Sequence, residues 1–574
     1  MVGSIVKRKP KGCKKPIYSY HETWRVKIDP NAKGKGPGSG KSRVVSRDIY
    51  LGSAEDILRK CTEGVVPEEI EHRDFGLVCA ALETATELGI VEAIDEVVPK
   101  RRQGLTVGQY MLIGILNRIC EPRSRRGLKK WFERTVLPQK MGIDHKGLSS
   151  QNFWDHFDLI LSEEEASRED DLFSDDAVLK IEEAVWKRLM NRYNLNLDCV
   201  LYDTTNFYTY LSPSTPSSLA RTGHNKQGRH NLRQVGLAMA VTRGGQLPLF
   251  HMLYHGRKHD VRLFPEALTS LVNRYLALHR STSKMTVVFD KGNNSPGNIR
   301  HALSQGVWVV GSLVPSHHPD LCGVQLRRFE EKVDKKPVFR TEKNLFGVDM
   351  AVAVVYNKST YRRKKLRLRQ NVERLREEIR ETFARIKHKS IKDIRERMRD
   401  LIRDSTYGRY LEVEVSGRRH KTLTCRISLK NYLRKLRTFG KTIIFSDNRS
   451  LTTEELVRSY VDRHQIEDQF RQMNDSEAIA FQPMYCWTDS KIRVYALMCV
   501  LALLLLQLMN YRAQKAGLCM SNAVLREEMA DIREVVLLYS PTSVVHKLTR
   551  LSLVQQKLFH LFNLARYAPG NRSP

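Results

Sequence analysis

A continuous apolar run from Val494 to Leu506 constrains the fold more than any other feature of this sequence. Such a segment must be removed from water, either in a protein core or in a lipid bilayer. The run is shorter than the roughly 20 residues that a membrane-spanning helix needs. Charged residues at Lys491, Arg493 and Arg512 bracket it closely. We therefore predict a buried core helix around which other elements pack, and no membrane partner.

The chain is too long for that helix to serve a single core. At 574 residues, about two to four domains are expected. Lys and Arg number 96 against 64 Asp and Glu, which leaves a net charge of +32. An excess of this size predicts a polyanionic partner, because binding to phosphates releases condensed counterions. A ribosome-associated protein and a merely basic surface are the alternatives.

The cysteines argue against two structural classes. None of the ten has C-x-x-C spacing, so neither a zinc knuckle nor a disulfide framework is indicated. The basic segment Met1–Lys15 lacks the apolar stretch of a secretory signal. Scattered thiols without such a signal fit the reducing cytoplasm.

The first part of the chain divides into a β region and a helical region. Tyr18–Ile28 and Arg43–Leu51 are rich in β-branched and aromatic residues and flank the Gly- and Lys-rich segment Asn31–Ser42. This pattern predicts a β-hairpin with a long basic loop. From Ala54 to Asn194 apolar residues recur at helical spacing. Within that stretch, residues 105–134 are compatible with a helix-turn-helix, although three-helix packing without DNA binding is equally common.

Strands and helices alternate after Asn194. Strands are predicted at Asp198–Thr204, Gln234–Thr242, Leu247–Tyr254, Met285–Asp290 and Val307–Leu313, and helices at Val261–His279 and Asn294–Gln305. This order predicts a layered α/β domain.

A charge-dense segment, Tyr361–Asp404, follows with a different pattern. Its apolar residues from Leu368 to Ile386 recur at alternating steps of three and four. That spacing is typical of a coiled-coil seam, and the polar break at residues 387–390 predicts a helical hairpin. Short strands at Tyr410–Val415, Leu423–Ser428 and Thr442–Ser446 precede an end of the chain that we predict to be helical.

Two aspartates stand where α/β sheets place reactive groups. Asp203 and Asp290 each end an apolar strand and lead into a turn containing Thr or Gly. Carboxylates at the C-terminal ends of neighbouring strands can lie side by side. Taken singly, such an Asp is more often a cap or a turn former.

A third acidic residue belongs to a polar helical face. Within a helix predicted over Thr453–Asn474, one face carries Tyr460, Arg463, Glu467, Arg471 and Asn474. The alternative is a solvated face stabilised by the i,i+4 pair of Arg463 and Glu467.

These residues resemble the motifs of a known family. The pattern Y-x-x-R-x-x-x-E at Tyr460, Arg463 and Glu467 resembles the Y-R-E-K signature of insertion-sequence DDE transposases, which have an RNase H-like core. The contexts of Asp203 and Asp290 are similar to those of that family's two aspartates. The segment 223–234 resembles its G-x-S-K-x-x-R-x-D-L-x-Q block, with Asn225 and Asn231 as departures. The resemblance spans residues 18–511.

The resemblance implies an α/β fold in which an RNase H-like catalytic core is interrupted by an α+β insertion domain. A β-hairpin and a helical DNA-binding region would precede the core, and a helical region would follow it. The implied parts are residues 1–60 (basic β-hairpin region), 61–195 (helical DNA-binding domain), 196–313 (first part of the core), 314–445 (insertion domain with the helical hairpin), 446–515 (second part of the core) and 516–574 (C-terminal helical region).

The implied activity is cut-and-paste DNA transposition of an insertion sequence, by metal-dependent hydrolysis and strand transfer at transposon ends. Asp203, Asp290 and Glu467 would be catalytic and would hold Mg²⁺, with Mn²⁺ as a substitute. Implied DNA contacts are Tyr460, Arg463, Arg471, Asn474, Lys226 and Arg229. The partners would be double-stranded transposon ends and target DNA, with a homodimer in the synaptic complex. The place would be a prokaryotic cytoplasm, at the nucleoid.

One position departs from the signature. The family's lysine, seven residues after the glutamate, corresponds to Asn474 here, and Arg471 on the same face is the candidate substitute. Two other functions remain open: another RNase H-like nuclease, and a catalytically silent transposase-derived DNA-binding protein.

Two further groups of residues have a structural interpretation and a functional one. His251, His255 and His259 recur every fourth residue, but they straddle a predicted strand and turn, which argues against zinc. The aromatic residues near Asp203 are typical of a core, although one could stack on a base at a distorted DNA end. They are Tyr202, Phe207, Tyr208 and Tyr210.

Overall fold

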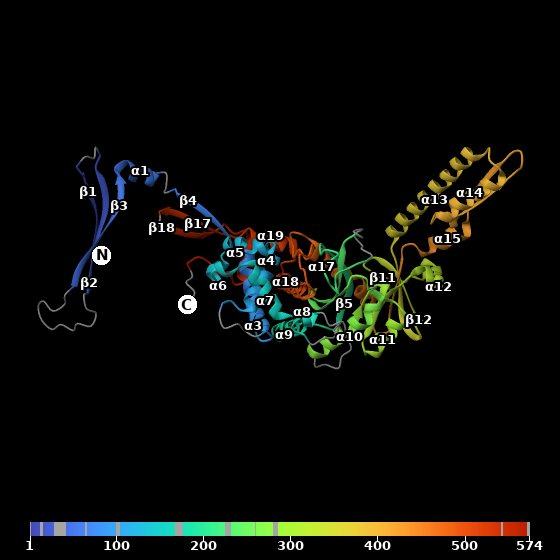
Figure 1. The fold of residues 1–574 in the computed structure, drawn as a ribbon, viewed down its shortest axis with the longest axis horizontal. Helices are drawn as coiled ribbons and strands as arrows, with labels where there is room; N and C mark the ends of the chain where they lie inside the picture. The colour runs from blue at the N-terminus through green and yellow to red at the C-terminus, as the bar shows by residue number, and fades with distance from the viewer. Residues whose placement is uncertain are drawn as a thin grey trace. The chain divides into compact units, whose positions relative to one another are not determined.

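The computed structural model describes residues 2–11, 15–27, 42–62, 66–98, 104–166, 176–223, 231–258, 260–278, 285–540 and 543–570. The chain folds as two compact units, each described by itself below (Figure 1). The first comprises residues 1–73, 533–550 and 568–574, and the second comprises residues 74–532 and 551–567.

The described residues of the first unit form two small three-stranded sheets and one helix. Strands β2 (Ile17–Lys27) and β3 (Ser42–Ser53) pair as the predicted hairpin, and β1 (Val2–Arg8) adds a third strand to it. Helix α1 spans Ala54–Thr62. The basic loop between β2 and β3 lies outside the described residues.

The second small sheet corrects the expectation of a wholly helical C-terminal region. β17 (Arg533–Ser540) and β18 (Ser543–Leu548) form a hairpin that pairs with β4 (Glu69–Asp74). Valine recurs in both strands, and β-branched residues favour the extended backbone. The partner β4 is distant in sequence, so no local pattern indicates this pairing.

Helices of the second unit surround α18 (Asp489–Lys515), which contains the apolar run. By length and composition α18 could cross a membrane, yet 94% of its most apolar window is buried inside the protein. The predicted core helix is therefore confirmed. The helices of this part are α2 (Gly76–Glu87), α3 (Ile90–Asp95), α4 (Val107–Cys120), α5 (Arg125–Glu133), α6 (Leu137–Met141), α7 (Ser150–Ile160), α8 (Glu163–Ala166), α9 (Ala177–Arg192), α19 (Asn522–Ala530) and α20 (Leu553–Leu561).

The segment compatible with a helix-turn-helix contains α4 and α5. Helix α4 is buried along nearly its whole length and packs against α18, so it offers no face to DNA. Helix α5 exposes Arg126, Lys129 and Lys130, but its Arg125 stacks over the ring of Trp154 at 3.5 Å. The basic residues of this region therefore lie on one side of a helix anchored in the core.

A mixed sheet of ten strands forms the other half of the second unit, which makes the fold mixed α/β. Its first five strands are β5 (Cys199–Thr209), β7 (Arg233–Thr242), β8 (Pro248–His255), β9 (Thr286–Val288) and β10 (Trp308–Leu313). They lie in the order β8-β7-β5-β9-β10. β5 and β8 are each antiparallel to β7, whereas β9 runs parallel to β5, and β10 runs parallel to β9. Helices α10 (Asp260–Leu278) and α11 (Pro296–Ser304) precede β9 and β10.

Much of the segment predicted as an insertion domain extends this sheet. β16 (Lys441–Ser446) pairs with β10, and β13 (Val348–Tyr356), β12 (Lys336–Leu345) and β11 (Glu331–Val333) follow in order. The short strand β6 (Arg221–Thr222) lies at the opposite end of the sheet.

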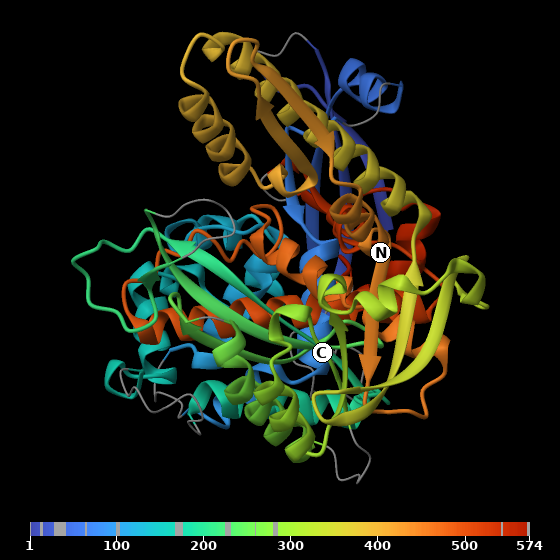
Figure 2. The ribbon, with the colours of Figure 1, turned by 90° about the vertical axis from the view of Figure 1, so that its right-hand side faces the viewer.

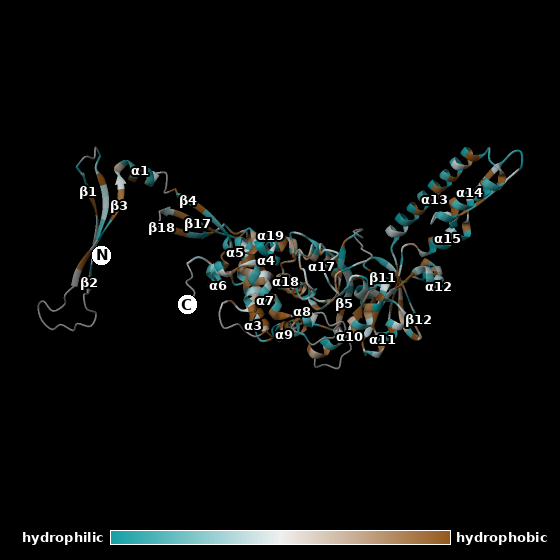
Figure 3. Ribbon diagram, in the orientation of Figure 1, coloured by the Kyte–Doolittle hydropathy of each residue, from teal (hydrophilic) through white to brown (hydrophobic). Residues whose placement is uncertain are grey.

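The residues between β13 and β16 have a core of their own. They form α13 (Lys358–Ile386), α14 (Ile391–Asp404), β14 (Leu411–Ser416), β15 (Thr422–Ile427) and α15 (Leu429–Thr438), drawn in gold and orange in Figure 2. Seam residues Leu368, Val372, Leu375 and Ile379 are buried in that core, which confirms the predicted helical hairpin. The rest of α13 is predominantly hydrophilic (Figure 3).

Candidate active site

The register of the sheet places the two predicted aspartates at the same level. In the parallel pair of β5 and β9, Leu201 is opposite Val288. Asp203 lies two residues beyond Leu201 within β5, which continues to Thr209 instead of ending at Asp203 as predicted. Asp290 lies two residues beyond Val288, just after the end of β9, so the register sets the two aspartates level with each other. This adjacency was a condition that the sequence left open.

Alternation along the strands decides which face the carboxylates take. Tyr202 and Phe289 pack against Phe264 of α10, with ring centroids 5.3 and 4.9 Å away. Because successive side chains of a strand point to opposite faces, Asp203 and Asp290 point away from α10. On that other face lies the chain segment that carries Glu467.

That segment is two helices, which corrects the single helix predicted over Thr453–Asn474. α16 (Thr453–Val461) ends at a tight turn, and α17 (His464–Asn474) follows it. Around the turn the backbone makes i→i−3 hydrogen bonds, such as Arg463 N to Tyr460 O at 3.2 Å. The side chain of Asp462 is held by Arg243, whose Nε donates to it at 2.6 Å. The sequence pattern is helical throughout, but the helix is interrupted at Asp462, where the contact with Arg243 is made.

The start of α16 is stabilised by a capping box. Thr452 Oγ1 accepts from Glu455 N at 3.2 Å, and Thr452 N donates to Glu455 Oε2 at 2.8 Å. Replacing Thr452 with alanine leaves helix donors unsatisfied, and we expect it to lower the free energy of unfolding by about 1 kcal/mol. Urea denaturation measures this, with Thr452→Ser as the control that keeps the cap. Equal loss in both variants would contradict the capping role.

Arg463 lies at the centre of the three carboxylates. Its guanidinium contacts Asp203 Oδ2 at 3.3 Å, Glu467 Oε1 at 2.6 Å and Asp290 Oδ1 at 3.8 Å. Tyr460 donates to Asp290 Oδ1 at 3.3 Å and shares a hydrogen bond of 2.6 Å with Ser312 of β10. The structure thus brings together the Tyr, Arg and Glu of the signature with both aspartates.

Burial and neighbouring charges keep Arg463 and Tyr460 in their protonated forms. Burial lowers the pKa of Arg463, but the charges of Asp290 and Asp203 outweigh it, so this pKa is raised. Burial also raises the pKa of Tyr460, with the charge of Asp290 acting in the same direction. The site therefore holds a permanent cation and a neutral phenol beside its carboxylates.

The site is open to solvent on one side. The side chain of Asp203 is 17% exposed, that of Asp290 33% and that of Glu467 47%. Tyr460, Arg463 and Glu467 also line a pocket of about 220 Å³ against β13 and β16. A substrate can reach Glu467 and Arg463 from this pocket.

The donor chemistry of the site suits a hard cation. All three acidic groups offer carboxylate oxygens, which are the ligands that Mg²⁺ prefers. As placed here they contact Arg463 rather than a common point, and within the described residues no three His, Cys, Asp or Glu side chains form a metal cluster. The three carboxylates are therefore suitable ligands for Mg²⁺, and in this structure the guanidinium of Arg463 lies between them.

The other predicted DNA contacts lie away from this centre. Arg471 is 75% exposed and pairs with Asp468, and Asn474 donates to the carbonyl of Phe470 at 2.9 Å. Lys226 and Arg229 lie outside the described residues.

One contact of the site was missed in the sequence. Ser312 is the hydroxyl residue of the otherwise apolar strand β10, and it meets Tyr460. A lone hydroxyl in a buried strand was the signal that could have indicated it.

Comparisons with known proteins give little at the level of sequence. No family model matches the chain, and no curated protein does. A solved structure described as a cryo-EM structure of the piggyBac transposase synaptic complex with hairpin DNA is similar over 88% of this chain and 86% of its own. Its sequence is 10% identical, and the TM-score is 0.37.

Proposed function

We propose that this protein is a DNA transposase of the DDE type, with Asp203, Asp290 and Glu467 as its catalytic carboxylates. The observation that carries the proposal is their convergence on Arg463 from two adjacent strands and one helix. We further propose that β8-β7-β5-β9-β10 is the RNase H-like core implied by the sequence resemblance. Three antiparallel strands followed by two parallel ones support it.

The three carboxylates would hold Mg²⁺, or Mn²⁺ in its place. Bound there, the metal would stabilise charge on the attacking and leaving oxygens of a phosphoryl transfer. Arg463 neutralises the carboxylates and offers a planar guanidinium that suits a DNA phosphate. Tyr460 holds Asp290 through its hydroxyl, which limits the rotation of that carboxylate.

The reaction at a transposon end would then have two steps. In the first, a water oxygen bonds to phosphorus, the bond to the 3′ oxygen breaks, and that oxygen leaves with a proton as the 3′-OH. In the second, this hydroxyl bonds to a phosphorus of target DNA, and the target's own 3′ oxygen leaves with the proton. Both steps suit one site that binds and orients phosphodiesters.

Arg471 tests the DNA-binding part of the proposal. Its exposed guanidinium, one turn from Asn474, would contact a phosphate in place of the signature lysine. For Arg471→Ala we expect weaker DNA binding and a fall of about one in the slope of log affinity against log salt. Fluorescence anisotropy with duplex DNA measures both, and Arg471→Lys should retain the slope. An unchanged slope in the alanine variant would remove Arg471 from the interface.

The decisive experiment is metal-dependent cleavage of duplex DNA that carries the sequences flanking the coding region. Cleavage that requires all three carboxylates supports the transposase. Binding without cleavage by the wild-type protein would instead favour the silent DNA-binding protein. A homodimer on DNA and a place at the nucleoid remain part of the proposal, and sizing with and without DNA tests the dimer.

A further inference from the structure

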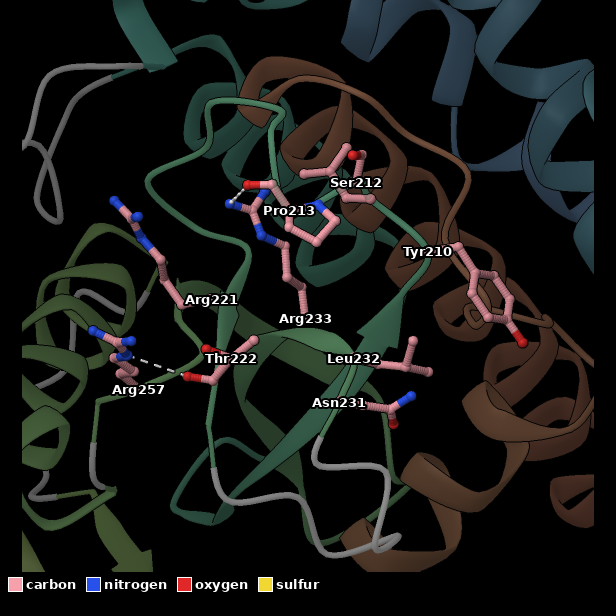
Figure 4. Close-up of a pocket in the computed structure, with 10 residues that line it drawn as sticks. Tyr210, Ser212, Pro213, Arg221, Thr222, Asn231, Leu232, Arg233 and Arg257 are labelled. Carbon is pink, nitrogen blue, oxygen red and sulfur yellow. Dashed lines mark hydrogen bonds between the residues drawn. The ribbon is translucent and has the colours of Figure 1, made fainter.

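A second pocket lies beyond the far end of β5, away from the carboxylates. Its volume is about 350 Å³, and its walls come from the segment after β5, from β6, from the start of β7 and from the turn after β8. Three arginines line it: Arg221, Arg233 and Arg257 (Figure 4).

The charge of these arginines is not balanced by acids. Arg233 donates to the carbonyls of Thr215 at 2.7 Å and Pro213 at 3.3 Å, and Arg257 donates to the carbonyl of Thr222 at 3.3 Å. Within the described part of the chain, none of the three forms an ion pair with a carboxylate. The guanidiniums of Arg221 and Arg257 are exposed and extend toward the same side in Figure 4.

A neighbouring histidine responds to this uncompensated charge. His255 ends β8, directly before the turn that carries Arg257. Burial lowers the pKa of His255, and the charges of Lys258, Arg221 and Arg257 lower it further. Of these three cations, Lys258 pairs with Glu266 at 2.5 Å, whereas Arg221 and Arg257 have no carboxylate partner among the residues that the structure describes. Arg221 and Arg257 therefore add to the positive potential at His255, which Glu266 only partly offsets.

Close packing of the backbone fixes the positions of Arg221 and Arg257. Gln234, fully buried, donates from Nε2 to the carbonyl of Gly256 at 2.8 Å. A Cβ at Gly256 would lie 2.2 Å from Gln234 O, and one at Gly223 would lie 2.4 Å from Gly256 O. The chain can approach so closely only with glycine at both places. This packing joins β6 to the turn after β8, so Arg221 and Arg257 face one pocket.

Exposed aromatic rings adjoin the pocket. Tyr210, one of its lining residues, is 52% exposed, and Tyr485 is 62% exposed. Their ring centroids are 6.1 Å apart, with an angle of 32° between the planes. The ring of Tyr210 lies across the pocket from Arg221 and Arg257 (Figure 4). Exposed rings and cationic groups along one groove are the combination on which nucleotides stack while their phosphates are neutralised.

The pocket is connected to the carboxylates by a single strand. Tyr210 follows Asp203 by seven residues along and just past β5. At about 3.3 Å per residue the two are about 23 Å apart, which corresponds to about seven base steps of DNA. One DNA molecule can therefore reach both places.

We propose that this pocket binds a backbone phosphate of DNA between Arg221 and Arg257, several base steps from the bond that is cleaved. The proposal rests on the proposed function in taking DNA as the ligand. The arginines supply charge-assisted hydrogen bonds in a fixed place, and the tyrosines, across the pocket, supply a surface for a base further along the strand.

The test measures DNA binding in EDTA, where cleavage does not contribute. The probe is a fluorescein-labelled DNA duplex, titrated by anisotropy at several salt concentrations. For the double variant Arg221→Gln/Arg257→Gln we expect a salt slope lower by about one and an affinity about tenfold weaker at about 0.1 M salt. Arg221→Lys/Arg257→Lys should restore most of the slope, since the charge is kept. Arg300→Gln on α11 is the matched control, since it removes an exposed charge elsewhere in the same unit.

The possible outcomes distinguish failure of the proposed phosphate site from failure of the proposed nuclease activity. A wild-type slope in the double glutamine variant, or an equal loss in Arg300→Gln, would overturn the phosphate site. An RNA duplex of the same sequence that competes equally would overturn its assignment to DNA. If the arginines prove necessary while no carboxylate-dependent cleavage is found, the pocket stands and the proposed catalytic function fails.

Discussion

Replacing Asp203, Asp290 or Glu467 with its amide is expected to lower metal-dependent DNA cleavage by at least about 10³-fold in each case, because residues that act as one catalytic unit fail together. An amide keeps the size of the side chain but loses the negative charge that a divalent cation needs. All three carboxylates contact the guanidinium of Arg463, so we expect each of them to be required for activity. The measurement is the rate of strand cleavage at the ends of DNA that flanks the coding region.

A neighbouring acid provides the control. Asp468 follows Glu467 on α17 but pairs with Arg471 instead of Arg463. Asp468→Asn should therefore cleave within a fewfold of the wild-type rate, provided that its DNA affinity is unchanged. Full activity in Asp203→Asn, Asp290→Asn or Glu467→Gln would exclude that residue from the catalytic set.

Replacing Glu182 with alanine is expected to destabilise the protein by about 3–5 kcal/mol, the cost of leaving a buried charge without its partner. Glu182 of α9 contacts His251 Nδ1 of β8 at 2.7 Å and Arg274 of α10 at 3.1 Å. The three side chains are 2%, 4% and 5% exposed. Without Glu182 the guanidinium of Arg274 remains buried and uncompensated. Urea denaturation followed by circular dichroism measures the change.

The next residue offers a matched comparison. Glu183 pairs with Lys187 at the surface of the same helix, with side chains 33% and 56% exposed. An exposed pair contributes only about 0–1 kcal/mol, so Glu183→Ala should be nearly neutral. Similar losses in the two variants would contradict a special role for the buried cluster. A triple variant, Glu182→Leu with His251→Leu and Arg274→Met, should recover much of the stability, because it removes every charge at once.

The histidine pattern shows how far local spacing can be interpreted. His251 and His255 lie on the same strand in different environments. His251 is buried against Glu182, whereas His255 is exposed beside the pocket lined by Arg221 and Arg257. His259 lies outside the described residues. Glu182, the partner of His251, comes from α9, 69 residues away along the chain, so no spacing rule could have indicated an ion-paired cluster.

Local periodicity determined what the sequence alone could predict. The apolar run had to become a buried helix, the strands before Asp203 and Asp290 had to enter a sheet, and the seam of Leu368 to Ile379 had to pack within a helical hairpin. These features follow from which residues must leave water and at what spacing they recur.

Only the tertiary structure decided what depends on partners far along the chain. The register of β5 against β9 sets Asp203 level with Asp290, and the turn at Asp462 directs Arg463 between the carboxylates. Strand pairing also drew β11–β13 and β16 into the main sheet, and β17 and β18 into a hairpin within a segment predicted to be helical. Strand register and tertiary contacts join residues that no short window of sequence contains, because hydrogen bonding between strands is indifferent to their separation along the chain.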